Sequence, residues 1–193
     1  MVVTHEVQSG ETLESIARRF GTTTSEILRV NDIPDQRLRA RMVIRIPILI
    51  IPPTVPSQRP YRNYHVRVVG NIMLVIATDR LLYQRNQPVR MELIKTNISS
   101  RPVTLTYNSS QRFDFIVRRG SGSIIWQWSY DRFFSGRQER VVLQPGASQI
   151  YRADWPQRSN EGDRVRPGVY TVHGENTAQE MRGRGASVSI RIV

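Results

Sequence analysis

Residue types that carry catalysis or hold metals are sparse in this chain, and they do not form a known pattern. The 193 residues include no cysteine, which excludes a cysteine nucleophile, a thiolate metal site and a disulfide framework. The three histidines, His5, His65 and His173, lack metal-ligand spacing, and no H-E-x-x-H, G-x-S-x-G or phosphate-loop motif is present. We therefore expect no catalytic residue, no metal site and no cofactor, and a binding protein rather than an enzyme.

A few acidic and aromatic residues leave alternatives open. Asp114, Asp131 and Asp154 could supply an acid pair, but the sequence does not fix their separation, and solvation at strand ends explains them better. Trp126 and Trp128 are two residues apart, so in a strand both rings lie on one face. They belong to the core or form the floor of a sugar-binding groove.

The net charge of +12 is unevenly distributed. Residues 1–50 carry seven arginines and six acidic residues, whereas residues 61–193 carry 20 basic and ten acidic residues, with Lys95 the only lysine. Such a surplus favours acidic partners, although base composition of the genome and solubility explain it equally well. Because no block of five basic residues occurs, a nucleic-acid partner is not expected.

The N-terminus has neither a basic start nor an apolar run of signal-peptide length. The longest apolar run, residues 48–51, is too short to span a bilayer. We expect a protein that is made in the cytoplasm without a signal peptide and has no membrane span.

Residues 4–47 show the periodicity of a small α+β unit. Residues 5–8 are expected to form a strand, after which Thr12 is a plausible helix N-cap. A second helix, opened by capping-box spacing from Thr23 to Glu26, is expected to run to Val30, and residues 42–47 to form a closing strand. The apolar residues of the first helix fall on one stripe that faces a core: Leu13, Ile16, Ala17 and Phe20.

These residues resemble the LysM module through V-x-x-G-[DE]-T-L-x-x-I-A-x-x-[FY]-G at residues 7–21 and the closing V-x-R-I-P. The resemblance implies a βααβ module over residues 1–48. It also implies binding of N-acetylglucosamine glycans such as peptidoglycan or chitin in a groove between two loops. By position the groove residues are Ser9, Gly10, Glu11, Thr12 and Leu13, with Asn31, Asp32, Ile33 and Pro34.

The match has two departures, and several of its residues have simpler explanations. Glu11 stands where the family more often has Asp, and Arg39-Ala40-Arg41 replaces the usual Pro-Gly before the last strand. Gly10 and Thr12 can serve only as turn and cap, and Leu13 can belong to the core stripe. On the ligand side, Leu13 or Ile33 would offer an apolar face to the acetamide methyl.

Residues 49–60 contain four prolines and favour an extended polyproline linker between two domains. The apolar start of this stretch could instead pack on the first domain. From residue 61 the period changes to that of strands. Short alternating segments separated by turns such as Pro145-Gly146 and Pro167-Gly168 predict one all-β antiparallel sandwich over residues 61–193. The expected strands include residues 71–78, 89–94, 103–107, 113–117, 124–128, 141–143, 148–155, 169–174 and 187–193.

An ordered set of phrases in this second part resembles the BsuPI-type intracellular proteinase inhibitor domain of spore-forming bacteria. They include N-I-S-S-R-P-V-T-L at residues 97–105, Q-R-F-D-F-I-V at 111–117, I-W-Q-W-S at 125–129 and P-G-V-Y at 167–170. The resemblance implies an immunoglobulin-like sandwich and inhibition of a subtilisin-like serine protease.

The most aromatic segment outside the expected strands is the candidate protein-binding loop: Tyr130, Asp131, Arg132, Phe133 and Phe134. Alternatively, Phe133 and Phe134 plug the bottom of the sandwich. We predict a non-enzymatic adaptor at the spore or cell wall that binds glycan through the first domain and a spore or wall protein through the second. The alternative is an inhibitor of a subtilisin-like protease, localised by the LysM-like module.

Overall fold

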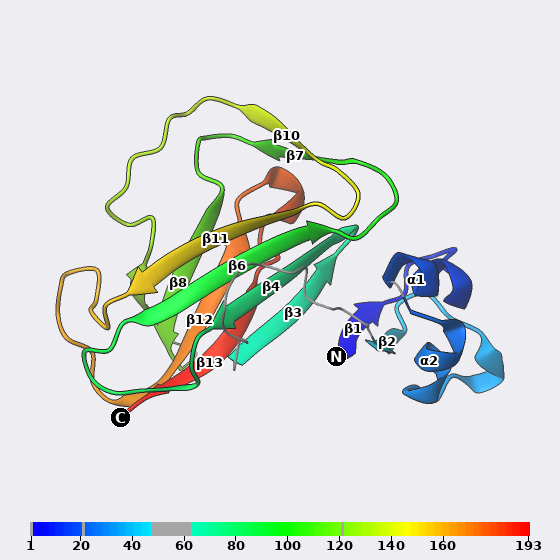
Figure 1. The fold of residues 1–193 in the computed structure, drawn as a ribbon, viewed down its shortest axis with the longest axis horizontal. Coiled ribbons are helices and arrows are strands. Elements are labelled where there is room, and N and C mark those ends of the chain that lie inside the picture. The colour runs from blue at the N-terminus through cyan, green and yellow to red at the C-terminus, as the bar shows by residue number, and fades with distance from the viewer. Residues whose placement is uncertain (1, 21, 48–62, 121) are drawn as a thin grey trace.

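The computed structural model describes residues 2–20, 22–47, 63–120 and 122–193. Its N-terminal part has the predicted βααβ order, with one extra 3-10 helix (Figure 1). β1 and β2 pair in antiparallel orientation, with Glu6 opposite Val43. The elements are β1 (Val2–Glu6), α1 (Leu13–Phe20), α2 (Thr24–Arg29), η1 (Pro34–Gln36) and β2 (Val43–Pro47).

Both α-helices begin at hydroxyl caps, as the sequence predicts. The amide of Ser15 donates to Oγ1 of Thr12 over 3.1 Å, and the amide of Glu26 donates to Oγ1 of Thr23 over 3.2 Å. These bonds satisfy backbone donors that have no partner inside the helix. The predicted apolar stripe of α1 is buried together with residues of α2 and β2.

The second part is a β-sandwich, as predicted. Its sheets contain β11-β6-β4-β3 and β5-β13-β12-β8-β9, and β7 pairs with β10 in a separate ribbon. All strand pairs are antiparallel except the short β5–β13 pair. The elements are β3 (Asn63–Val69), β4 (Ile72–Thr78), β5 (Leu82–Tyr83), β6 (Val89–Asn97), β7 (Val103–Tyr107), β8 (Phe113–Arg119), β9 (Ile124–Gln127), β10 (Glu139–Leu143), β11 (Ser148–Trp155), β12 (Gly168–Asn176), η2 (Gln179–Met181) and β13 (Ala186–Ile192).

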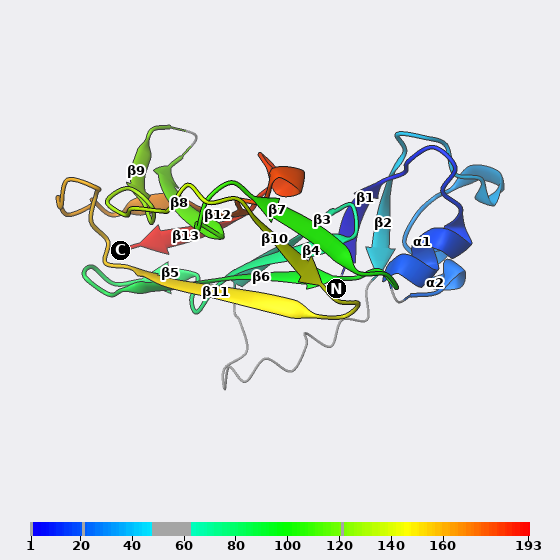
Figure 2. The same ribbon diagram turned by 90° about the horizontal axis from the view of Figure 1, so that it is seen from above.

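The two sheets form separate layers, and the apolar core lies between them (Figure 2). Trp155, Tyr83, Tyr170 and Phe115 are among its largest fully buried side chains. Every second residue of β6 from Val89 onwards is buried, since alternate residues of a strand face one side of the sheet. This alternation also carries a lysine into the core.

The N-terminal module is not separated from the sandwich by solvent. Val66 of β3 and Met73 of β4 are buried in the same apolar cluster as Ile44 and Ile46 of β2, and β1 contacts β3. The outer face of the sandwich sheet thus covers part of the module. The predicted proline linker, residues 49–60, falls outside the described residues.

Most strand boundaries differ from the sequence prediction by one to three residues, and the differences at the first strand and at β3 have a clear structural cause. The first strand ends at Glu6, two residues earlier than expected, because the chain turns at Gly10 with a φ of +84° and Glu11 bonds back to the amide of Gln8 over 2.9 Å. β3 had not been predicted as a strand. It pairs with β4 over its whole length, so its conformation depends on a partner that follows it.

Candidate functional site

The first predicted glycan loop, residues 9–13, is mostly open to solvent. Ser9, Gly10 and Thr12 are exposed, and a side chain at Gly10 would meet no atom within 4 Å. Glycine is therefore favoured there by its left-handed backbone rather than by a lack of space. Leu13, in contrast, is buried with the core of α1.

Glu11 has a structural role in this loop. Its carboxylate lies 2.7 Å from Nε2 of His5, accepts from the amide of Gln8 over 2.9 Å and pairs with Arg19. Burial alone would raise the pKa of Glu11, but the Gln8 amide, His5 and Arg19 lower it, so that its pKa lies below the ordinary value. The carboxylate fastens the loop to β1 and α1, and little of it faces solvent.

The second predicted loop, residues 31–34, is fixed by an amide clamp. Oδ1 of Asn31 accepts from the amide of Arg45 over 2.6 Å, while its Nδ2 donates to the carbonyls of Ile27 and Arg45. Asp32 and Pro34 are exposed. Ile33 is buried in the same cluster as Leu13, so one core supports both predicted loops.

The exposed surface of the two loops therefore comes from Ser9, Gly10, Thr12, Asp32 and Pro34. Leu13 and Ile33 keep only about a fourteenth of their surface, 7% each, open to solvent. An apolar contact with an acetamide methyl would have to use that small remainder. Backbone groups and short polar side chains make up the rest of the surface that a sugar would meet.

The unusual loop before β2 has a strained residue. Arg41 has a φ of +70°, and its amide donates to the carbonyl of Val7 over 2.7 Å. A left-handed conformation costs a non-glycine residue roughly 1–2 kcal/mol. The glycine that is usual before this strand would avoid that cost.

The predicted protein-binding loop lies between β9 and β10, on the side of the molecule away from the N-terminal module in both views (Figures 1 and 2). Tyr130, Asp131, Arg132 and Phe133 are exposed. Phe134 is half-buried and packs on Trp128, with ring centroids 6.0 Å apart. Phe133 does not plug the sandwich, whereas Phe134 does contact its edge.

A buried carboxylate organises the start of this loop. Asp114 of β8 accepts from the amide of Ser129 over 3.2 Å, from its hydroxyl over 2.5 Å and from Nε2 of Gln127 over 2.6 Å. Its side chain is almost completely buried, and buried charge is tolerated where donors satisfy it. Asp114 is thus a structural support, and within the described residues neither Asp131 nor Asp154 forms a hydrogen bond with it.

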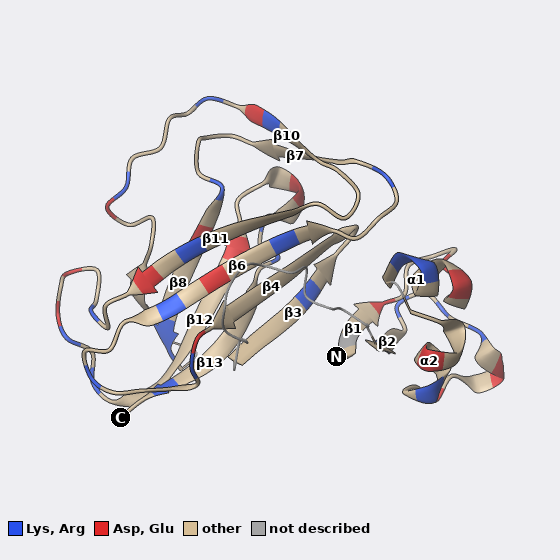
Figure 3. Cartoon of the chain, in the orientation of Figure 1, with Lys and Arg blue, Asp and Glu red and all other residues tan. Residues whose placement is uncertain are grey.

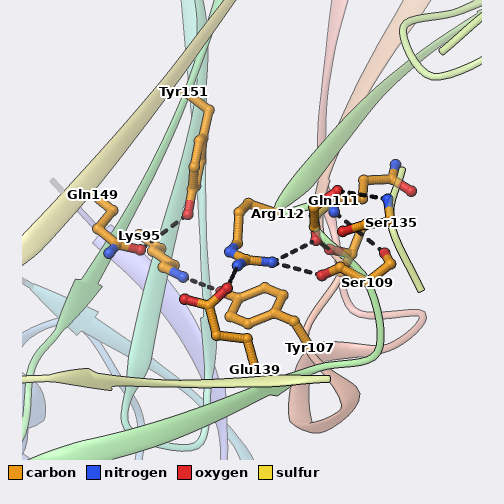
Figure 4. A network of polar contacts seen from close by, with 11 residues as sticks. Lys95, Tyr107, Ser109, Gln111, Arg112, Ser135, Glu139, Gln149 and Tyr151 are labelled. Atoms are coloured by element: carbon orange, nitrogen blue, oxygen red, sulfur yellow. Dashed lines mark hydrogen bonds and ion pairs between the residues drawn. The ribbon is translucent and has the colours of Figure 1, made fainter. Parts of the chain in front are cut away.

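A polar network inside the sandwich was missed by the sequence prediction (Figure 4). Lys95 of β6 is fully buried and its amine bonds to the hydroxyl of Tyr107, with the Tyr151 ring 5.7 Å away. Arg112 stacks on the Tyr107 ring at 4.5 Å. Burial, followed by repulsion from Arg112, lowers the pKa of Lys95 to about 7. The signal in the sequence was the only lysine, which lies one residue beyond the expected strand 89–94, in phase with Val89, Met91 and Leu93.

The same network extends to the protein-binding loop. Nη1 of Arg112 donates to the carbonyl of Ser109 over 2.7 Å, and Nη2 pairs with Glu139. The next residue, Ser110, bonds twice to Ser135: its amide donates over 2.9 Å and its hydroxyl accepts over 3.0 Å. Figure 4 shows the contacts of Arg112 with Ser109 and Glu139.

Within the described residues, no group of three His, Cys, Asp or Glu side chains could hold a metal ion. No described helix is long and apolar enough to cross a membrane.

Trp126 and Trp128 are half-buried against the sandwich core. Basic and acidic residues are interspersed along β6 (Figure 3).

Two family models match the chain, in the order expected from the sequence. The LysM domain model matches residues 5–47. The BsuPI model, described as intracellular proteinase inhibitor, matches residues 76–181, which is more than half of the chain. Among curated proteins, comparison found none that matches.

Solved structures give only distant likenesses. A β-glucosidase from Erythrobacter marinus aligns with 67% of this chain and 15% of its own, at 14% identity and a TM-score of 0.38. The CARDB domain of PF1109 from Pyrococcus furiosus aligns with 64% of this chain and 94% of its own, at 12% identity and a TM-score of 0.37. Likeness at this level carries no conclusion about function.

Proposed function

The chain belongs to the BsuPI family of intracellular proteinase inhibitors, and we propose that it is a non-enzymatic adaptor. Its LysM domain binds a glycan that contains N-acetylglucosamine, such as peptidoglycan or chitin, and its sandwich binds a protein partner. The protein is made in the cytoplasm and associates with the spore or cell wall. The observation that carries the proposal is the LysM match over residues 5–47 in the same chain as the BsuPI match.

The geometry is compatible with binding both partners at once. The proposed glycan surface comprises Ser9, Gly10 and Asp32, which are exposed above a well-packed core. The proposed protein contact, residues 130–134, lies toward the other end of the long axis in Figure 1. A partner on one surface would therefore not cover the other.

The glycan part is tested by pelleting the full chain with insoluble chitin at low and high salt. Chitin is uncharged, so binding through the surplus of +12 is not expected to contribute, and pelleting should survive high salt. Ser9→Gln places a bulkier neutral side chain on the glycan surface and should weaken pelleting. Ser25→Gln is the matched control on α2, where Ser25 is exposed.

Two outcomes would contradict glycan binding at this surface. One is the absence of salt-resistant pelleting with both chitin and peptidoglycan. The other is equal pelleting of Ser9→Gln, Ser25→Gln and the unchanged chain, which would move the glycan contact elsewhere.

Proteinase inhibition is the second candidate function, and the family match favours it. In this version the LysM domain serves for localisation, and the sandwich contacts a subtilisin-like serine protease. Titration of such a protease with the full chain tests it, with the residual hydrolysis of a chromogenic peptide as readout. Unchanged turnover at excess protein would remove this function for that protease.

A further inference from the structure

The segment that joins β9 to β10 exposes two aromatic residues, Tyr130 and Phe133, and Phe133 is the more exposed of the two. Residues 132–138 form neither helix nor strand, and none of them has a positive φ. Phe133 is fully exposed, with 103% of the reference exposure of a phenylalanine residue. A phenylalanine with no shielding at all is unusual on a protein surface, because its ring forgoes the free energy of burial.

The residues on either side of Phe133 are turned back onto one indole ring. Arg132 lies over the Trp128 ring at 4.3 Å, and its Nε donates to the Trp128 carbonyl over 2.9 Å. Phe134 packs on the same ring. Trp128 in turn packs on Phe113, with centroids 4.2 Å apart, which connects this support to the sandwich core. Phe133 thus projects outward between two anchored neighbours.

The backbone is also fastened on both sides of this position. At the start, Ser129 bonds to the buried carboxylate of Asp114 through its amide and its hydroxyl. At the end, Ser135 exchanges two hydrogen bonds with Ser110. A segment held in place before binding loses little conformational freedom when a partner grips it.

A protruding apolar side chain on a fixed stretch of backbone outside any helix or strand fits one kind of partner well. The substrate cleft of a serine protease takes up an unpaired backbone and places one side chain in a specificity pocket. The charges beside Phe133 are of both signs, Asp131 and Arg132, so the ring rather than a charge identifies the pocket. An apolar pocket is the one that would accept it.

We propose that Phe133 is the residue that enters the specificity pocket of a serine protease with a preference for large apolar residues, and that residues 132–135 occupy its substrate cleft. This assignment rests on the proposed inhibitory function. The anchors on Trp128, Asp114 and Ser110 hold the Phe133–Phe134 peptide bond in the bound conformation. They also keep its two ends together if the protease cuts it, which favours inhibition over rapid turnover.

The test measures inhibition constants of the full chain against subtilisin and trypsin with chromogenic substrates. Phe133→Ala should weaken inhibition of subtilisin by about 10- to 100-fold, the effect of leaving a pocket for a phenylalanine ring empty. Phe133→Arg should lose as much against subtilisin but gain against trypsin, whose pocket carries an aspartate. Val142→Ala is the matched control, because Val142 is an exposed apolar residue on β10.

The outcomes separate this assignment from the function on which it rests. If the unchanged chain inhibits subtilisin and Phe133→Ala does so within about threefold, inhibition stands and Phe133 is not the pocket residue. Absence of a trypsin gain in Phe133→Arg would also count against it. If the unchanged chain inhibits neither protease, both inhibition and this assignment fail.

Discussion

Lys95 predicts an unusual dependence of stability on pH. It is the only lysine in the chain, and it is fully buried where β6, β7 and β11 contribute residues to the core. Tyr107 and Tyr151 face its amine, and Arg112, which acts on it electrostatically, has a charge of the same sign. Glu139 pairs with Arg112 rather than with the amine. A charged amine there is poorly compensated, so folding favours the neutral form.

The sign of this pH dependence follows from the protons that Lys95 binds in the folded and in the unfolded protein. Burial lowers the pKa of Lys95 from its ordinary 10.5 to about 7 in the folded protein. Between these values the unfolded chain holds a proton that the folded protein does not, so the free energy of unfolding rises with pH. At pH 7 the free energy of unfolding rises with half of its maximal slope. Above pH 7 the slope approaches its maximum of about 1.4 kcal/mol per pH unit. The rise from pH 7 to pH 9 is therefore about 2 kcal/mol.

Urea unfolding at a series of pH values and constant ionic strength measures this rise. In Lys95→Met the rise should disappear, because methionine fills a similar volume and binds no proton. Tyr151→Phe is the matched control. It alters the same network but keeps the amine, and burial raises the pKa of Tyr151 far above this range, so the slope should remain. The difference between the variants removes the contribution of all other titrating groups.

The pKa of Lys95 can be measured directly, because it is the only lysine in the chain. Lysine labelled with ¹³C at Cε gives one side-chain resonance, whose shift should titrate near pH 7 in the folded protein and near 10.5 after unfolding. A folded-state midpoint close to 10 would refute the reasoning. So would equal pH slopes for the unchanged chain and Lys95→Met.

Two further predictions concern the LysM domain. Arg41→Gly should stabilise the chain by about 1 kcal/mol, because glycine adopts the left-handed conformation without strain; Arg41→Ala, which keeps the strain, is the control, and equal unfolding midpoints would contradict the explanation. Asn31→Ala should destabilise it by about 2–3 kcal/mol, since the Arg45 amide and carbonyl both lose their partner; Asp32→Ala, on an exposed neighbour, should change the unfolding midpoint little.

The LysM domain could be predicted closely because its signals are local. The caps at Thr12 and Thr23 and the stripe of α1 are written within a few residues of one another, and the structure confirms them. The role of Asn31 could not be predicted, because its clamp joins it to Arg45, fourteen residues away. A capping pattern can be recognised from neighbouring residues in the sequence. A hydrogen-bonded clamp between distant residues can be recognised only once the fold is known.

In the sandwich, too, local patterns could be predicted from the sequence, whereas contacts between distant residues could not. Alternation predicted strands such as β11, whose limits match residues 148–155. The expected strand 89–94 ended one residue before Lys95, so the sequence did not predict that Lys95 lies in the core or that Tyr107 and Tyr151 surround its amine. The exposure of Phe133 could not be predicted either, because the sequence allows its side chain to be buried under the sandwich or to face solvent. In the structure Trp128 packs against Phe134, and Phe133 faces solvent.

The shared cluster changes the expectation of two domains joined only by a spacer. Val66 and Met73 point away from the sandwich core and are buried with residues of the LysM domain. Burying a side chain of this size contributes about 1.5–3 kcal/mol, and a sandwich on its own would expose both. The two parts therefore stabilise each other, and the proposed glycan and protease surfaces are held on one body. A glycan-bound molecule would then present Phe133 in a set direction, which a freely swinging tether would not do.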